Sequence, residues 1–516
     1  MMEKRAFQPA SAAAGPDMKL FYACFVSLVT TAFGFILRAL MLPEWGRQFN
    51  LTQTQLGEIA GVGLWPFAIS IVLFSLIIDK IGYKTAMIFA FVCHISSALI
   101  TIFATGYWML YLGTFIVALG NGTVEAVANP VVATMFSREK TKWLNRLHAA
   151  WAFGLVLGGF IALVMGAATR WEYKIALILL PTVVYGFMML ARKFPPNERV
   201  QAGVTYREML QEVGAIGALI ISALIVFQLG AVFHWPIAVN VIITLLVTVW
   251  FGYYTKSLGQ PLFIILLLVM VPLATTELGT DSWITDLMTP EMTRLGLQAG
   301  WVLVYTSAIM FVLRLFAGTI VHKVSPLGLL AICSGIAAVG LYLLSLSSGV
   351  AILFAATLYG LGKSFFWPTM LGVVAERFPK GGALTLNVTG GMGMIAAGVI
   401  GAGILGFIQD KSIDSKISTY DQANHTSIHS TYVTENRTSL FGNYQALDQS
   451  KLDAASPQEV QTVNTIRDNA KKEALRYIVF FPLIMLVSYG LLIFYFKSKG
   501  GYQAVVLNRE PEATAY

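Results

Sequence analysis

The sequence predicts an all-α integral membrane protein, and its composition and the spacing of its apolar residues support this class. Of the 516 residues, 56% are hydrophobic and 12% are charged, against roughly 25% charged residues in ordinary soluble domains. The apolar residues fall into blocks of about 20, the length at which an α-helix crosses ~30 Å of hydrocarbon. Long unbroken apolar runs favour helices over the alternating strands of a membrane barrel.

The apolar blocks predict about fourteen membrane-spanning helices, grouped as six, two and six. We expect a first six-helix bundle in residues 1–192, a cytoplasmic linker with two accessory helices in 193–260, and a second bundle in 261–516. The first six spans are expected near 19–42, 56–78, 85–105, 107–136, 144–168 and 174–192. The accessory pair is expected near 214–233 and 236–255. The last six are expected near 261–288, 297–321, 327–347, 351–378, 381–408 and 474–497.

The basic residues of the short loops predict the orientation. One side has fourteen of them, namely Lys80, Lys84, Arg138, Lys140, Lys142, Arg146, Arg192, Lys193, Arg199, Arg207, Lys256, Lys323, Arg377 and Lys380. The other side has four, namely Arg47, Arg170, Lys174 and Arg294. Because basic loops stay in the cytoplasm, both termini are expected there, and the two bundles should be parallel repeats about an axis normal to the membrane.

Residues 409–473 form a polar segment between the last two spans, rich in Ser, Thr, Asn, Asp and Gln. Its expected place is outside the membrane, as a small cap or a partly ordered insertion. His425 and His429 are spaced as a metal pair would be on a helix, but the Ser/Thr-rich context argues against a regular helix there. Cys24, Cys93 and Cys333 lie far apart inside apolar spans and are interpreted as small core residues. No metal and no cofactor are expected.

The joint between the second and third spans contains the first functional motif. It reads Asp79-Lys80-Ile81-Gly82-Tyr83-Lys84, and it resembles the signature of the major facilitator superfamily, an acid, a base, a glycine turn and a second base. Gly318 followed by His322-Lys323 is a degenerate echo in the second bundle. Glycine permits the turn, while Asp79 and Lys84 can pair with helix ends and hold one conformation closed. The alternative is that the two lysines of this motif only fix the orientation of the helices in the membrane.

The fourth span contains a stripe of polar residues. Asn121, Glu125 and Asn129 recur every four residues and share one helical face. A carboxylate in mid-span must face a cavity, find a partner or hold a proton; a structural ion pair is the alternative. With Leu144-Asn145 at the start of the fifth span, this stretch is similar to the fucose-permease-like branch of the superfamily.

The resemblance to this branch implies a sugar:proton symporter in which the acid on the fourth helix acts in proton coupling and sugar contact. That position falls on Glu125, and the polar sugar-binding position of the fifth helix falls on His148, with Trp151 one turn further on. The acid that the branch has on its first helix is absent, because Ala39 stands there. The neighbouring Arg38 either pairs with Glu125 or contacts an anionic substrate.

The second bundle has its own intramembrane charges. Glu277 and Asp281 share one face of a helix, where repulsion between the two carboxylates would favour binding of a proton or a cation. The alternative is that both acids face water at the outer end of the helix. Arg314 and Lys363 need acidic partners, and those two acids are candidates. Pro368 can break the tenth helix of the two bundles. The neighbouring Trp367 either stacks on a sugar ring or packs against other helices. Asn387, at the start of the eleventh helix of the two bundles, belongs to a Leu-Asn pair like the one that begins the fifth helix.

These features predict a secondary active transporter that uses alternating access to move a small polar solute, a sugar above all, by proton symport. The expected substrate site comprises Arg38, Asn121, Glu125, Asn129, His148, Trp151, Glu277, Asp281, Lys363, Trp367 and Asn387, with Glu125 and Asp281 as proton-coupling residues. Export of drugs or carriage of organic anions is the alternative within transport, and a membrane sensor or polytopic enzyme is the alternative outside it. We expect no enzymatic activity, no nucleic-acid partner, and a monomer in a bacterial inner membrane.

Overall fold

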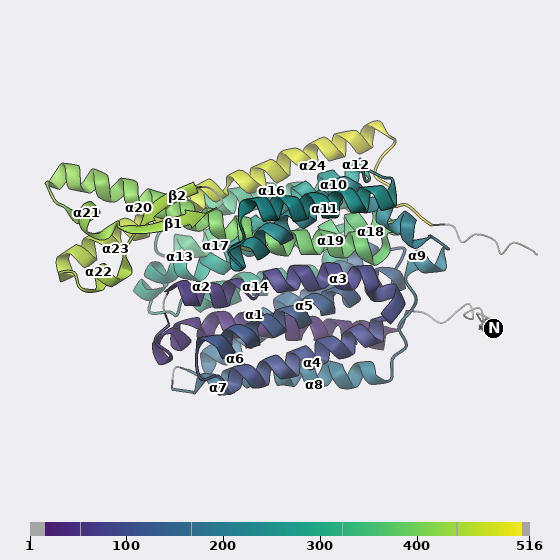
Figure 1. Cartoon of the computed structure of the whole chain (residues 1–516), viewed down its shortest axis with the longest axis horizontal. Coiled ribbons are helices and arrows are strands. Elements are labelled where there is room, and N and C mark those ends of the chain that lie inside the picture. The colour runs from purple at the N-terminus through teal and green to yellow at the C-terminus, as the bar shows by residue number, and fades with distance from the viewer. Residues whose placement is uncertain (1–15, 52, 167, 322, 440–441, 508–516) are drawn as a thin grey trace, which may run out of the picture.

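A computed structural model describes residues 16–51, 53–166, 168–321, 323–439 and 442–507 of the chain. Two helical bundles lie lengthwise beside each other, and a polar insertion projects from one end (Figure 1). Residues 16 and 507 both lie near the opposite end. The end from which the insertion projects is called here the insertion end, and the opposite end, where the described chain begins and ends, is called the terminal end.

The first bundle is built from helices that match the six spans expected from the sequence. They are α1 (Met18–Gln48), α2 (Gln53–Gly61) with α3 (Trp65–Ile81), α4 (Tyr83–Ile102), α5 (Tyr107–Met135), α6 (Lys140–Val164), and α7 (Trp171–Ala176) with α8 (Leu179–Leu190). Asp17 caps α1 by accepting bonds from the backbone N–H groups of Lys19 and Leu20. Gly82 joins α3 to α4 at φ 81°, a left-handed conformation that favours glycine.

A linker and an accessory helix pair follow. The short α9 (Glu198–Gln201) leads to α10 (Tyr206–Val232), which begins with a capping box between Thr205 and Glu208, and then to α11 (Ile237–Thr255). Most side chains of α11 are exposed and apolar. In a bilayer this surface faces lipid.

The second bundle repeats the six-span layout with more interruptions. It comprises α12 (Pro261–Ala274), the π-helix η1 (Thr275–Gly279), α13 (Thr280–Arg294), α14 (Gly300–Leu315), α15 (Ala317–Val321), α16 (Pro326–Leu346), α17 (Ala351–Lys363), α18 (Phe366–Arg377), the 3₁₀ turn η2 (Pro379–Gly381), α19 (Gly382–Ile395), the π-helix η3 (Ala396–Gly401), the first part of α20 (Ala402–Asn424), and α23 (Pro457–Ile478) with α24 (Phe480–Ser498).

The insertion is more regular than its composition indicates. Helix α20 continues out of the bundle to Asn424 and is followed by α21 (Ile428–Tyr432), strands β1 (Glu435–Ser439) and β2 (Gly442–Ala446), and α22 (Gln449–Asp453). The strands are antiparallel, with Glu435 opposite Ala446. Ile417, Val463 and Ala470 belong to a separate apolar core, because α20 and α23 pack against each other along this region. A folded unit therefore replaces the loop-like context expected around the two histidines.

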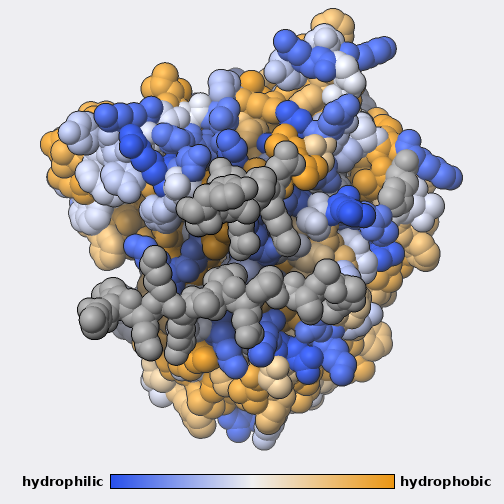
Figure 2. Space-filling view, turned by 90° about the vertical axis from the view of Figure 1, so that its right-hand side faces the viewer, coloured by the Kyte–Doolittle hydropathy of each residue, from blue (hydrophilic) through white to orange (hydrophobic). Residues whose placement is uncertain are grey.

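The length and composition of the helices agree with a membrane protein. Among the described residues, eleven helices are long and apolar enough to cross a bilayer. The shorter α14 and the interrupted pairs α17–α18 and α19–α20 account for the other three expected spans. Hydrophilic residues gather over the terminal end, with hydrophobic residues on its flanks (Figure 2). The fold class predicted from the sequence is confirmed.

The two bundles are in contact at both ends. Toward the terminal end, the Asn145 amide donates to Thr369 Oγ1 at 3.1 Å, and the Thr141 hydroxyl donates to Glu376 at 2.5 Å. Toward the insertion end, α6 packs so closely on α14 that a Cβ on Gly159 would lie 2.9 Å from the Val304 side chain. The space between the bundles is consequently enclosed near the middle of the molecule.

Candidate functional site

A small cavity of about 20 Å³ lies between the two bundles. Side chains of both bundles line it: Phe67, Glu125, His148 and Trp151 from the first, and Glu277, Leu278, Arg314, Trp367 and Met394 from the second. Five of these nine belong to the substrate site expected from the sequence. The cavity is therefore shared between the two bundles.

Glu125 faces this cavity from α5 with neutral partners only. The Asn129 amide donates to Glu125 Oε2 at 3.2 Å, and Asn129 Oδ1 lies 2.9 Å from His148 Nε2. The carboxylate is 4% exposed. Among the residues that the structure describes, no basic side chain makes an ion pair with it. The four-residue spacing seen in the sequence thus places Asn129 beside Glu125.

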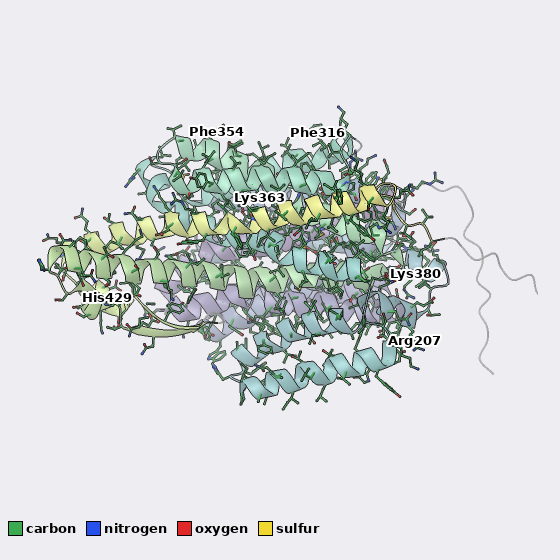
Figure 3. The ribbon with its side chains drawn as sticks, turned by 90° about the horizontal axis from the view of Figure 1, so that it is seen from above. Arg207, Phe316, Phe354, Lys363, Lys380 and His429 are labelled. Atoms are coloured by element: carbon green, nitrogen blue, oxygen red, sulfur yellow. The ribbon has the colours of Figure 1, made fainter. Side chains whose placement is uncertain are left out.

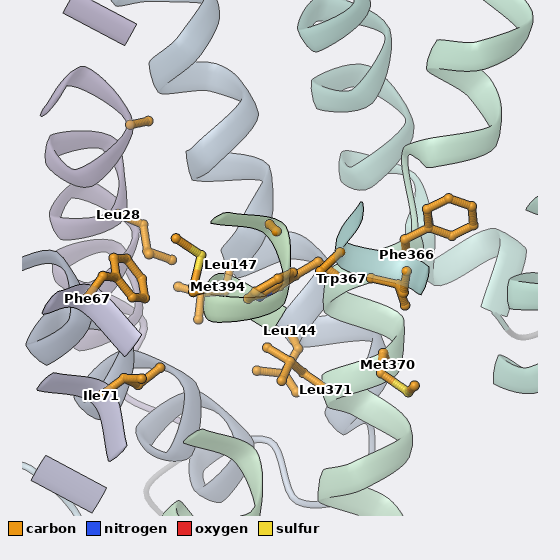
Figure 4. Close-up of a cluster of buried hydrophobic side chains, with 14 of the residues drawn as sticks. Leu28, Phe67, Ile71, Leu144, Leu147, Phe366, Trp367, Met370, Leu371 and Met394 are labelled. Carbon is orange, nitrogen blue, oxygen red and sulfur yellow. The ribbon is translucent and has the colours of Figure 1, made fainter. Parts of the chain in front are cut away.

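Aromatic and apolar side chains form the other walls of the cavity. Trp367 and Met394 lie between Phe67 on one side and Phe366 on the other (Figure 4). Trp151 packs against Phe35, with ring centroids 5.5 Å apart. Trp367 Nε1 is buried, and its N–H interacts with the Glu125 carboxyl group. The cavity therefore presents flat apolar faces beside this carboxyl group.

Glu277 and Arg314 form a buried ion pair at the edge of the same cavity. Arg314 Nη2 donates to Glu277 Oε1 at 3.0 Å, and the backbone N–H of Trp367 donates to Glu277 Oε2 at 3.1 Å. The two side chains are 1% and 3% exposed. The expected pairing of Arg314 with Glu277 or Asp281 is confirmed. The alternative that Glu277 faces water is wrong, because its side chain is buried.

Lys363 and Asp281 form a second buried pair, which does not line the cavity. Lys363 Nζ donates to the two carboxylate oxygens of Asp281 at 2.5 and 2.6 Å, and Thr306 accepts at 3.4 Å. The Lys363 ammonium also lies 5.1 Å from the Tyr359 ring centroid. Figure 3 shows Lys363 in the interior, while Arg207 and Lys380 lie at the terminal end and His429 in the insertion. Asp281 is thus neutralised by a lysine, not solvated.

The helix that contains Lys363 is broken where the sequence indicated. Helix α17 ends at Lys363 and α18 begins at Phe366, so that Pro368 lies in the first turn of α18, where a missing N–H is tolerated. The interruption leaves the carbonyl oxygen of Ser364 free to accept a bond from Arg314 Nε at 2.6 Å. The carbonyl oxygen left free at the break therefore accepts one of the hydrogen bonds that hold the Arg314 side chain.

Arg38 and Asn121 lie inside the first bundle and do not line the cavity. Arg38 Nη2 donates to Ser97 Oγ at 2.7 Å and to Thr101 Oγ1 at 3.1 Å. Asn121 Oδ1 lies 3.0 Å from His94 Nε2, not beside Glu125. The expected pairing of Arg38 with Glu125 is wrong, because the arginine's position on α1 directs it to the hydroxyl groups of α4.

The remaining residues of the predicted site lie at contacts between elements. Asn387 Nδ2 donates to the carbonyl oxygen of Ala126 at 3.1 Å, across the two bundles. Asp79 pairs with Arg199 of the linker, and Lys84 donates to the carbonyl oxygen of Leu190 at 2.8 Å. The acid of the motif therefore ties α3 to α9. His322, part of the echo in the second bundle, lies outside the described residues.

Four cavity residues are not in the substrate site predicted from the sequence: Phe67, Leu278, Arg314 and Met394. The signal for Arg314, a base in mid-span, predicted an acidic partner and not a place in the site. The apolar three had none, because any span contains such residues. In the insertion, His429 pairs with Asp414 at 2.6 Å, so the two histidines do not form a joint site. The described residues contain no group of three metal-ligating side chains.

Comparison with known proteins shows what the chain is similar to. A sequence model of the Major Facilitator Superfamily matches residues 23–200. The fold resembles that of FucP, the fucose:proton symporter of E. coli, with a TM-score of 0.54 and 15% identity, covering 90% of this chain and 98% of that one. The resemblance to this superfamily that the sequence predicts is thus confirmed over residues 23–200, and the chain shares the fold of FucP.

Other relatives show how widely the substrates of similar proteins differ. The human organic anion transporter MFSD10 covers 92% of this chain and 100% of its own, with a TM-score of 0.59 and 11% identity. The gentisate transporter of Corynebacterium glutamicum is 24% identical over 374 residues, 70% of this chain and 73% of the relative. At these identities the solved structures establish the fold of this chain, and its function has to be argued from the cavity.

Proposed function

We propose that this protein is a transporter of the Major Facilitator Superfamily that moves a small polar solute, a sugar or related polyol, together with a proton by alternating access. The observation on which the proposal rests is Glu125, a buried carboxyl group that faces the shared cavity and has only neutral partners. An ionised carboxylate in such a place is costly, whereas a protonated one is not. Binding a proton at Glu125 therefore makes the closed state accessible.

The other acids of the second bundle are less suited to bind the proton. Glu277 is neutralised by Arg314 and Asp281 by Lys363, so that protonating either would leave a buried base unpaired. We therefore assign proton coupling to Glu125 and give Asp281 a structural role. Of the two proton-coupling residues that the sequence predicted, Glu125 and Asp281, only Glu125 keeps this role in the proposal.

The types of side chain that line the cavity suit a sugar. Indole faces can stack on the apolar face of a sugar ring, and Trp151 and Trp367 both line the cavity. The Trp367 N–H, His148 and Glu125 provide polar contacts for hydroxyl groups. FucP, similar in fold, is a fucose:proton symporter, which favours the same class of cargo.

The predicted orientation gives the terminal end a gating function. With the termini in the cytoplasm, the Asp79–Arg199 pair and the Thr141–Glu376 contact lie on the cytoplasmic side. Both must loosen for inward opening, since they join α3 to the linker and α6 to α18. We propose a bacterial inner membrane as the location and a monomer as the working unit.

The test is uptake by purified protein in proteoliposomes, with and without an imposed pH gradient. The panel contains labelled fucose, xylose and gentisate. We expect gradient-driven uptake of a sugar in the wild type, and at least about tenfold less in Glu125→Gln because glutamine has no carboxyl group that can bind and release a proton. Glu208→Gln is the matched control, since it removes an exposed carboxylate and glutamine preserves the capping box. Gradient-driven uptake that survives in Glu125→Gln contradicts the assignment.

Carriage of an organic acid is the second candidate. Arg314 lines the cavity and could face a carboxylate, and the gentisate transporter is a relative. Accumulation of gentisate but of neither sugar in the panel would favour this candidate. Uptake that appears only when the gradient is reversed would favour export. Absence of transport with ligand binding confined to the insertion would favour a sensor.

A further inference from the structure

A second cavity lies where the insertion leaves the second bundle. Its volume is about 410 Å³, against about 20 Å³ for the cavity between the bundles, and falls within the range of roughly 300–1,000 Å³ that ligand sites occupy. Residues of α20 between Phe407 and Lys416 line it, together with Glu473 and Tyr477 of α23. These two helices run side by side out of the bundle (Figure 1). The cavity is called here the insertion-base cavity.

Both helices change from apolar to polar at the level of this cavity. On α20, Phe407 and Ile408 are followed one turn later by Lys411, and on α23, Glu473 is followed one turn later by Tyr477. Because α20 leaves the bundle and α23 returns to it, the apolar residues of both helices lie toward the bundle and the polar ones toward the insertion. In a bilayer such a change marks the boundary between hydrocarbon and headgroups, where tyrosine is enriched. The insertion-base cavity therefore lies at the depth of lipid headgroups.

The polar end of the cavity has an excess of positive charge. The Ser412 hydroxyl donates to Glu473 Oε2 at 2.7 Å, and Lys416 Nζ lies 3.1 Å from the same oxygen. The Lys411 ammonium lies 5.2 Å from the Phe407 ring centroid, and within the described chain it makes no ion pair. Two lysines and one glutamate leave one positive charge without a partner in the lining. The cavity thus suits a ligand with a single negative charge.

The apolar end of the cavity continues as a row of exposed side chains. Tyr477 is followed by Phe480, Ile484, Val487 and Leu491 at alternating spacings of three and four residues, so that all five lie on one helical face. Each of them is exposed, from 37% at Ile484 to 67% at Leu491. The row follows α24 away from the insertion, along the length of the second bundle (Figure 1). An acyl chain joined to a headgroup in the cavity can lie along this row, whereas a soluble anion makes no use of it.

We propose that the insertion-base cavity binds an anionic phospholipid from the leaflet at the insertion end. The phosphodiester accepts hydrogen bonds from the Lys411 ammonium and the Ser415 hydroxyl, and an acyl chain covers Tyr477 and Phe480. Hydrogen bonds in which both donor and acceptor are charged are about twice as strong as neutral ones, and one bound phosphate neutralises the excess charge of the lining. This inference requires only that the helices cross a bilayer, and it does not rest on the proposed transport.

The test counts lipids on full-length protein. Purified protein in micelles of a neutral detergent is titrated with phosphatidylglycerol or phosphatidylcholine, and native mass spectrometry measures how many lipids each protein binds. We expect the first phosphatidylglycerol to bind at least about fivefold more tightly than the first phosphatidylcholine, since the quaternary ammonium of the latter cancels the charge of its phosphate.

The decisive variant is Lys411→Gln, which removes the lysine without an acidic partner. Lys411 is exposed, so the replacement should leave the fold intact. We expect phosphatidylglycerol to bind about fivefold more weakly, the effect of one basic residue near a lipid surface, and phosphatidylcholine to bind as before. Lys411→Arg keeps the charge and should bind phosphatidylglycerol within about twofold of the wild type. The matched control is Lys497→Gln, which removes the same charge from the far end of α24 and should also stay within about twofold.

Three results would overturn the proposal. Equal affinity of the wild type for the two lipids, or no effect of Lys411→Gln, would show that the cavity does not select an anionic lipid. Equal weakening in Lys497→Gln would assign the effect to the overall charge of the protein. Displacement of phosphatidylglycerol by glycerol phosphate at the same concentration would show that the cavity takes a soluble phosphate and that the apolar row contributes nothing.

Discussion

The two bundles share a layout but treat their buried charges differently. In the second bundle each acid meets a base, Glu277 with Arg314 and Asp281 with Lys363. In the first bundle Arg38 meets hydroxyl groups, and Glu125 meets an amide. Within the described residues, Arg38 and Glu125 at mid-span of the first bundle thus form no ion pair, whereas the mid-span charges of the second bundle are paired.

This difference indicates a division of roles between the repeats. A buried pair is costly to separate because either partner left alone is an uncompensated charge. A single carboxyl group with neutral partners can change its protonation state without breaking a pair. Under the proposed proton symport, the second bundle would act as the electrostatic frame, and the first would contain the group whose charge changes during the cycle. The predictions below test this contrast from the largest expected effect to the smallest.

The largest effect is expected when one partner of a pair in the second bundle is removed. Lys363→Ala leaves Asp281 buried with an unpaired charge and should lower the free energy of unfolding by about 3–5 kcal/mol. Because all three cysteines are buried, a thiol-reactive dye in detergent can report unfolding. The Asp281→Asn/Lys363→Met double variant should regain most of the loss. A single variant as stable as the wild type would show that the pair does not matter for stability.

An intermediate effect is expected for the hydrogen-bonded chain in the first bundle. His94 lies between Asn121 and Tyr185, at 3.0 and 2.9 Å. His94→Phe leaves two buried polar groups without their partner and should cost about 1–3 kcal/mol, whereas Tyr185→Phe removes one bond and should cost about 0.5–1.5 kcal/mol. The same dye assay measures both. Equal stability of the two variants would argue against a continuous chain through His94.

The smallest effect is expected for the single charge of the first bundle. Ser97 and Thr101, the partners of Arg38, also donate to the carbonyl oxygens of Gly113 and Ser97. Arg38→Met therefore leaves no orphaned hydroxyl group, and the change in unfolding free energy should stay within about 1 kcal/mol. A loss as large as that in Lys363→Ala would remove the contrast between the bundles. Loss of uptake at full stability would support the substrate contact that the sequence predicted for Arg38.

Much of the fold follows from the sequence because a bilayer acts on each segment separately. A block of about 20 apolar residues forms a helix whatever its neighbours are, and the observed helices fall where the apolar blocks predicted them. Gly82 and Pro368 marked a turn and a break through local backbone chemistry. The four-residue spacing of Glu125 and Asn129 likewise placed their side chains on one face of α5.

The tertiary structure decided which charges meet. Arg38 and Arg314 are both arginines in mid-span, yet one contacts hydroxyl groups and the other an acid, because the rotation and depth of each packed helix select its partners. The insertion formed its own core from apolar residues scattered through a polar sequence. The cavity depends in the same way on side chains far apart in the chain. The physical reason is that solvent preference is a property of a segment, whereas a contact between side chains exists only when two packed segments bring them to the same depth and face.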